Sequence, residues 1–277
     1  MESVVICAAP TGARRGKADH PAIPITPDEI ARVAASCAAA GAQALHLHVR
    51  ADDDSHSLDP DRYRAAIAAV RAEAGDAMIV QVTTEAVERF TRQEQMAAMR
   101  ALVPEAMSMA VRELIPDDAS EPEAAAFLAW ALTERIGLQF IVYTPDDAER
   151  LKELVRRGVV PDTPHALFVL GRYTPGQRSE PRDLHPFLVT WPTAWPWTVC
   201  AFGPLEAQCL AEAIELGGHV RVGFENNLYR PDGTLADDNA EQVAAMRRIV
   251  ERSGRPLASV TDARRLYGAP AAASAGS

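Results

Sequence analysis

The chain has 277 residues, of which 48% are hydrophobic and 24% are charged, and a chain of this length can bury one large core. Its formal net charge of -10 argues against nucleic acid or an anionic membrane surface as the main partner, because the average field would repel both. No apolar run approaches the ~20 residues of a membrane span, and no basic segment followed by a long apolar one opens the chain. We therefore expect a soluble, cytoplasmic protein.

Short apolar runs alternate with amphipathic helical patterns along the chain. Runs of this length, apolar on both faces, predict the buried strands of a parallel sheet covered by helices. Eight such strands are expected, at residues 3–9, 44–49, 78–82, 106–110, 139–143, 166–170, 197–202 and 219–224.

Helix boundaries are marked between these strands. Thr26, Asp59 and Thr144 each precede a proline and an acidic residue, which is typical of a helix N-terminus, and Glu121 also precedes a proline. We expect helices to end at five glycines, which are Gly41, Gly75, Gly137, Gly158 and Gly217.

Eight strand–helix units of near-uniform size predict a single-domain (β/α)8 TIM barrel, with an open doubly wound parallel sheet as the alternative. We expect the catalytic domain to span residues 1–268. Residues 269–277 contain only Ala, Gly, Ser and Pro and are expected to be a disordered tail. In a barrel, the long loops at residues 15–25 and 171–186 follow strands, so they lie on the C-terminal face, where active sites are built.

Two histidines in one apolar run, His46 and His48, are one residue apart, so a strand places both imidazoles on the same face. This arrangement can present two nitrogens to one metal ion, although buried histidines can also be satisfied core residues. Glu225 follows the last predicted strand and could be a third ligand, or could pair with Arg50 or Arg221 instead. Two imidazoles and one carboxylate leave an open position, which is typical of catalytic zinc sites and also suits iron, manganese or cobalt.

Four stretches, at residues 9–13, 21–29, 41–50 and 217–227, together resemble the β-keto acid cleavage enzyme family, whose founding activity cleaves 3-keto-5-aminohexanoate. The most specific parts are the HxHxR and GGHxRxGxE motifs in the last two stretches. The resemblance implies a zinc-dependent (β/α)8 barrel, usually a homotetramer. It also implies a reaction in which a β-keto acid and acetyl-CoA give acetoacetate and a new acyl-CoA.

The resemblance assigns roles to individual residues. The implied ligands of Zn²⁺ are His46, His48 and Glu225. Thr83 stands where the family has a substrate-contacting Ser, and Ser108 stands where it has a Thr. Both positions keep a hydroxyl, so both are predicted to bind substrate.

Arg221 and Asn226 occupy the implied catalytic positions. Arg221 matches an Arg that works in the family with an adjacent Asp to abstract a proton, but that Asp is Asn226 here. An amide has no lone pair of useful basicity at neutral pH, so Asn226 cannot be a general base. Glu85, Glu113 or a water whose pKa a metal lowers to ~7 would have to act instead.

Two further departures concern the substrate. Arg14 and Ile141 stand where the founding member has glutamates that suit an amino group, so we expect a substrate with a neutral or anionic side chain. Arg14 could also be a solvated loop residue. Four other loop arginines could bind the phosphates of CoA, namely Arg112, Arg172, Arg178 and Arg182.

Two other functions are compatible with this sequence. One is a CoA-independent, metal-dependent hydrolase or retro-aldol lyase on the same barrel, which the missing Asp favours. The other is a non-catalytic relative that binds a metal and a small acid.

Overall fold

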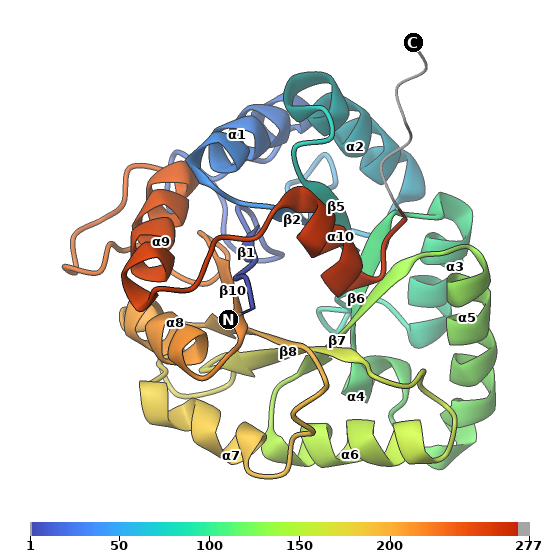
Figure 1. Cartoon of the computed structure of the whole chain (residues 1–277). Coiled ribbons are helices and arrows are strands. Elements are labelled where there is room, and N and C mark those ends of the chain that lie inside the picture. The colour runs from blue at the N-terminus through green and yellow to red at the C-terminus, as the bar shows by residue number, and fades with distance from the viewer. Residues whose placement is uncertain (1, 271–277) are drawn as a thin grey trace.

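The computed structural model describes residues 2–270, which form a closed barrel of eight parallel strands inside a ring of helices (Figure 1). Neighbouring strands follow chain order, and the last strand pairs with the first. The barrel strands are β1 (Ile6–Ala8), β2 (Ala44–Leu47), β5 (Ile79–Thr83), β6 (Ala106–Ala110), β7 (Gly137–Val142), β8 (His165–Leu170), β9 (Trp197–Ala201) and β10 (His219–Val222). The predicted TIM barrel is confirmed, and the open-sheet alternative is wrong.

The strands are joined by helices whose N-termini the sequence marks. Thr26 and Thr144 each close a capping box, and Asp59 accepts a hydrogen bond from the backbone N–H of Asp61. The helices are α1 (Pro27–Ala40), α2 (Pro60–Ala74), α3 (Arg92–Leu102), α4 (Val111–Leu114), α5 (Glu121–Thr133), α6 (Pro145–Arg156), α7 (His185–Leu188), α8 (Glu206–Glu215), α9 (Asn239–Ser253) and α10 (Val260–Tyr267), with 3-10 turns η1 (Asp118–Ser120) and η2 (Pro181–Leu184). A short hairpin, β3 (Val49–Arg50) and β4 (His56–Ser57), follows β2.

The predicted helix ends are correct at some glycines and wrong at one. Gly41 and Gly75 cap α1 and α2, whereas Gly158 and Gly217 lie one residue beyond the C-caps of α6 and α8. Gly137 does not end a helix but opens β7, because α5 already ends at Thr133 and the chain turns over the three residues between them.

Three other predictions concern the loops, the tail and membranes. The loop at residues 171–186 is irregular only in its first part, since η2 and α7 occupy its end. Of the predicted tail at residues 269–277, residues 271–277 lie outside the described residues. Within residues 2–270, no helix has the length and apolar character needed to cross a bilayer.

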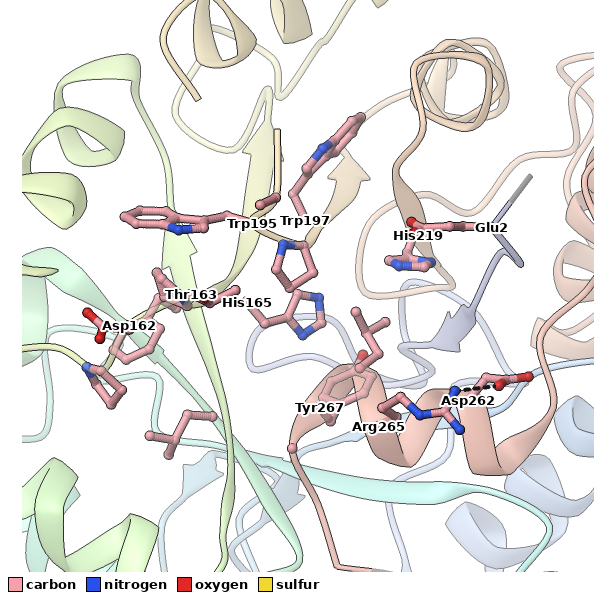
Figure 2. A pocket seen from close by; sticks show the side chains of 18 of the residues that line it. Glu2, Asp162, Thr163, His165, Trp195, Trp197, His219, Asp262, Arg265 and Tyr267 are labelled. Carbon is pink, nitrogen blue, oxygen red and sulfur yellow. Dashed lines mark hydrogen bonds and ion pairs between the residues drawn. The ribbon is translucent and has the colours of Figure 1, made fainter. Parts of the chain in front are cut away.

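A hollow of about 820 Å³ lies at the N-terminal end of the barrel (Figure 2). It is lined by His165 and His219, which open β8 and β10, and by Tyr267 at the end of α10, the helix that lies across this mouth of the barrel (Figure 1). Trp195 and Trp197 also line it, and Trp197 is otherwise packed in the core. The His46 and Glu225 segments lie at the opposite, C-terminal end.

Candidate metal centre and active site

Two histidines and a glutamate meet at the C-terminal end of the barrel. His46 lies in β2, His48 follows it directly, and both imidazoles are buried. His46 Nε2 is 3.1 Å from His48 Nε2, and Glu225 Oε2 is 3.7 and 3.6 Å from these two nitrogens. Tetrahedral ligand atoms with bonds of ~2.0–2.2 Å stand roughly 3.3–3.6 Å apart. The three atoms are therefore spaced as ligands of one metal ion.

The protonation states of the two histidines also suit the binding of a cation. The amide nitrogen of Gln81 donates a hydrogen bond to Gln139 Oε1 (3.0 Å). The amide oxygen of Gln81 lies 2.8 Å from His46 Nδ1 and accepts a hydrogen bond from it, so Nδ1 carries the proton of this imidazole. His46 Nε2 therefore presents its lone pair. Burial lowers the pKa of His46 to about 4 and that of His48 well below its ordinary value, so both are neutral at pH 7. Glu225 Oε2 accepts no hydrogen bond from any described residue, although it is buried, and a divalent cation would satisfy it.

Two glycines allow Glu225 to reach the histidines. Gly223 has φ 148°, and a Cβ there would lie 2.4 Å from the carbonyl oxygen of Ala9. Gly12 has φ 65°, and a Cβ there would lie 2.5 Å from Glu225 Cγ. A side chain at either position would displace the turn or the carboxylate of Glu225, which explains why both positions are glycine.

The ion pair that the sequence offered as an alternative for Glu225 coexists with the histidine contacts. Arg221 Nη2 lies 3.0 Å from Glu225 Oε1, and both side chains are almost fully buried. Arg50 instead donates to the backbone carbonyls of Gly12 (2.6 Å) and Arg15 (2.7 Å). Glu225 thus uses one oxygen for Arg221 and turns the other toward the imidazoles, so ion pairing and metal binding are compatible.

Two small adjacent pockets open beside this cluster, and both are lined by Glu85, Arg172, Phe202 and Glu225. We call one the triad pocket, because it is also lined by His46, Thr83, Ile141 and Arg221. We call the other the arginine pocket, because it is also lined by Arg14 and Arg15.

The structure brings most of the predicted residues to these pockets but not all of them. Thr83 and Arg221 line the triad pocket, and Arg14 lines the arginine pocket. Ser108 pairs with Thr83 across the strands but is fully buried and lines neither pocket. Asn226 is also fully buried outside both linings, and neither polar atom of its side chain has a hydrogen-bond partner among the described residues.

Of the arginines expected to bind CoA, Arg172 lines both pockets. Arg112 is paired with Asp147, and Arg182 extends into solvent beside Glu180. Neither of these side chains nor that of Arg178 lines the triad pocket or the arginine pocket.

Sequence reasoning missed several residues that hold the site together. Arg15 donates to the carbonyls of Phe224 (2.7 Å) and Glu225 (3.2 Å), fixing the turn from the first loop. Gln81 is in register with His46 and orients it. A polar residue inside an otherwise apolar strand was a signal for Gln81, whereas nothing in the sequence distinguishes Arg15 from other loop cations.

Glu206, at the start of α8, is a further buried carboxyl near the site. Its Oε2 accepts a hydrogen bond from Asn227 (3.2 Å). Burial raises the pKa of Glu206 from 4.5 to about 8. Between pH 4.5 and about 8, the carboxyl of Glu206 is ionised in the unfolded chain but still protonated in the folded chain. The free energy of unfolding should therefore fall as the pH rises through this range.

The Glu206→Gln variant should remove this pH dependence. We expect its thermal stability to match the wild type near pH 5, where the carboxyl is neutral in the fold. At pH 9 it should exceed the wild type by on the order of 4 kcal/mol. Thermal unfolding at both pH values measures this, with Glu73→Gln on the exposed face of α2 as the control. Equal melting temperatures of wild type and Glu206→Gln at pH 9 would contradict the assignment.

The fold and the cluster define a class of barrel enzyme that has a candidate metal centre at the C-terminal ends of its strands. A model of the beta-keto acid cleavage enzyme family matches residues 3–268. The 3-keto-5-aminohexanoate cleavage enzyme of Fusobacterium nucleatum is 33% identical to this chain, over 96% of this chain and 98% of that enzyme. The 3-oxoadipate:acetyl-CoA acetyltransferase of Cupriavidus necator is 30% identical, over 96% of this chain and 95% of that one.

The chain therefore belongs to the β-keto acid cleavage enzyme family, and the resemblance read from its motifs is confirmed. Among solved structures, a ternary complex of ObcA with a C4-CoA adduct and oxalate matches with a TM-score of 0.72. The match covers 90% of this chain and 68% of ObcA at 18% identity, so it supports the fold.

Proposed function

We propose that this enzyme converts a β-keto acid and acetyl-CoA into acetoacetate and a new acyl-CoA, with Zn²⁺ held by His46, His48 and Glu225. The observation that carries the proposal is the convergence of these three ligand atoms in a barrel of this family. A divalent cation bound there would polarise the keto group of the substrate. The name of the Cupriavidus necator relative, 3-oxoadipate:acetyl-CoA acetyltransferase, supports the choice of acetyl-CoA as the co-substrate.

Arg221 and Thr83 supply hydrogen-bond donors to the triad pocket. Arg221 contacts Glu225 through Nη2, and its Nε has no partner in residues 2–270, so it can bind a substrate carboxylate or a developing oxyanion. Thr83 Oγ1 accepts a hydrogen bond from Glu85 N (3.0 Å), which leaves its O–H to donate to substrate. The buried positions of Ser108 and Asn226 favour a role in supporting the pocket over direct contact with substrate.

The arginine pocket supports a substrate with a neutral or anionic side chain. Its three arginines outnumber the two carboxylates in its lining, Glu85 and Glu225, so the net charge disfavours an ammonium group. Ile141 provides no carboxylate in the triad pocket. We therefore expect 3-oxoadipate, which carries a second carboxylate, to be a better substrate than 3-keto-5-aminohexanoate.

The test is incubation of the purified enzyme with each of these two acids, with and without acetyl-CoA, while acetoacetate formation and consumption of the acid are both measured. We expect acetoacetate only when acetyl-CoA is present. The rate with 3-oxoadipate should be at least about tenfold higher, because a like-charge contact costs more than ~1.4 kcal/mol. Faster turnover of the amino acid substrate would contradict the assignment of the arginine pocket.

A CoA-independent hydrolase or retro-aldol lyase is the second candidate, and Asn226 favours it because the position lacks a base. Cleavage that ignores acetyl-CoA would establish that candidate and reject the acyltransferase. A non-catalytic relative predicts no turnover of either acid. A homotetramer and a cytoplasmic location stay predictions from the sequence.

A further inference from the structure

The proposed reaction needs a proton acceptor, and Asn226 cannot be one. The carbon between the keto and carboxylate groups of a β-keto acid must lose a proton before it can form a new bond. An amide side chain is not basic enough to take that proton, and Asn226 lies outside both pocket linings. Another carboxylate has to reach the same space.

Glu85 is placed where the two pockets meet. It lines the triad pocket together with His46, Thr83 and Arg221, and it lines the arginine pocket as well. Its backbone is held on both sides, since its N–H donates to Thr83 Oγ1 (3.0 Å) and its carbonyl oxygen lies 2.9 Å from His56 Nε2. The main chain of Glu85 is thus held directly beyond the end of β5, and only 15% of its side-chain surface is exposed.

The carboxylate of Glu85 is also free to accept a proton. Its nearest cation is Arg172, at 3.8 Å, and no described residue donates a hydrogen bond to its oxygens. Burial raises the pKa of Glu85 to about 7, helped by Glu225 and Glu113 and opposed by Arg172 and Arg14. A carboxylate without a hydrogen-bond donor among the described residues, in the lining of the triad pocket, can accept a proton from a substrate bound there.

The other carboxylates near the site are committed elsewhere. Glu113 accepts a hydrogen bond from Ala86 N (3.0 Å) and lines neither pocket. Glu206 is buried against Asn227, and Glu225 faces the imidazoles and Arg221. Of the two carboxylates that the sequence suggested as replacements, the structure favours Glu85.

We propose that Glu85 is the general base and acid of the carbon–carbon bond exchange, a role that rests on the proposed function. Glu85 takes a proton from the carbon between the keto and carboxylate groups. The electron pair left on that carbon forms a bond to the thioester carbon of acetyl-CoA, and the C–S bond breaks to release CoA thiolate. The thiolate then bonds to the original keto carbon. The bond between this carbon and the deprotonated carbon breaks, and Glu85 returns the proton to the carbon that keeps the electron pair, which gives acetoacetate.

The test follows the first and last proton transfers directly. Acetoacetate, the proposed common product, is incubated with enzyme in D2O without acetyl-CoA, and loss of its C2 proton signal is followed by NMR above the buffer rate. We expect Glu85→Gln to lower the enzyme-dependent exchange by about 100-fold or more, because general base catalysis contributes ~10²–10⁴. Glu113→Gln, the matched control, should exchange close to the wild-type rate. Glu85→Asp, which keeps a carboxylate, should keep an intermediate rate.

Each outcome separates the role of Glu85 from the overall function. An exchange rate of Glu85→Gln equal to that of the wild type would overturn the proposal. The proposal would also be overturned if Glu85→Asp had the metal content and melting temperature of the wild type but exchanged as slowly as Glu85→Gln. The same variants are assayed for acetyl-CoA-dependent turnover. Turnover that is normal in Glu85→Gln would leave the acyltransferase intact and reject Glu85. Glu85-dependent exchange without any acyl transfer would reject the acyltransferase and keep Glu85 as the base.

Discussion

Replacing Arg221 by Met is expected to destabilise the protein by about 3–5 kcal/mol, because it leaves the buried carboxylate of Glu225 without its cation. Arg221 is 3% exposed, and its Nη2 contacts Glu225 Oε1 at 3.0 Å. The remaining Glu225 oxygen faces neutral imidazoles, which do not compensate a negative charge. For a chain of this size the expected loss corresponds to a melting temperature lower by roughly 6–15 °C. Turnover should fall by at least about 100-fold, because Arg221 also binds developing negative charge.

Calorimetry of metal-free protein measures the stability change, with Arg247→Met as the control. Arg247 and Glu251 form an ion pair of the same sequence spacing and nearly the same length (2.9 Å), but both side chains are about half exposed. Such surface pairs contribute less than ~1 kcal/mol. Added zinc should restore part of the stability of Arg221→Met, since the metal replaces the lost positive charge. Equal effects of the two substitutions would show that burial of the Arg221 pair has no energetic consequence.

The fold could be predicted because its signals are local. Each barrel strand is a short apolar run, and three of the four predicted helix starts carry their own side-chain cap, at Thr26, Asp59 and Thr144. Gly137 misled the prediction because a glycine after a helix is ambiguous: it can cap that helix or open the next strand.

The site could be predicted in part for the same reason. His46, His48 and Glu225 belong to contiguous motifs, so their residue types alone suggested a metal centre. The contacts that support them depend on strand register and loop path, which one sequence does not provide. Gln81 reaches His46 because β2 and β5 are in register, and Gly12 contacts Glu225 from the other end of the chain.

Burial also decides which of the residues assigned by the family pattern can reach the pockets. Ser108 and Asn226 occupy the expected positions in sequence but are fully buried outside the pockets. Glu85 was one of two carboxylates predicted as possible replacements for the missing base, and its place in the lining of both pockets distinguishes it from Glu113. Residue type predicted the chemistry, while the side-chain environment decided which residue can perform it.

Removing a ligand of the proposed metal centre should lower both metal affinity and turnover. In His46→Ala or Glu225→Ala only two of three ligand atoms remain, and the site loses either a neutral nitrogen donor or its negative charge. Mutating residues that only hydrogen-bond to metal ligands already lowers metal affinity by ~10–100-fold. Because these variants lose a ligand itself, we expect metal affinity and turnover to fall by at least about 100-fold. His219→Ala, in a barrel strand at the opposite end, is the control for loss of a barrel histidine.

The central measurement is the metal content of these proteins after identical purification and dialysis. The account predicts about one zinc ion per chain in the wild type and in His219→Ala, and almost none in His46→Ala and Glu225→Ala. Full retention of metal in both ligand variants would contradict it.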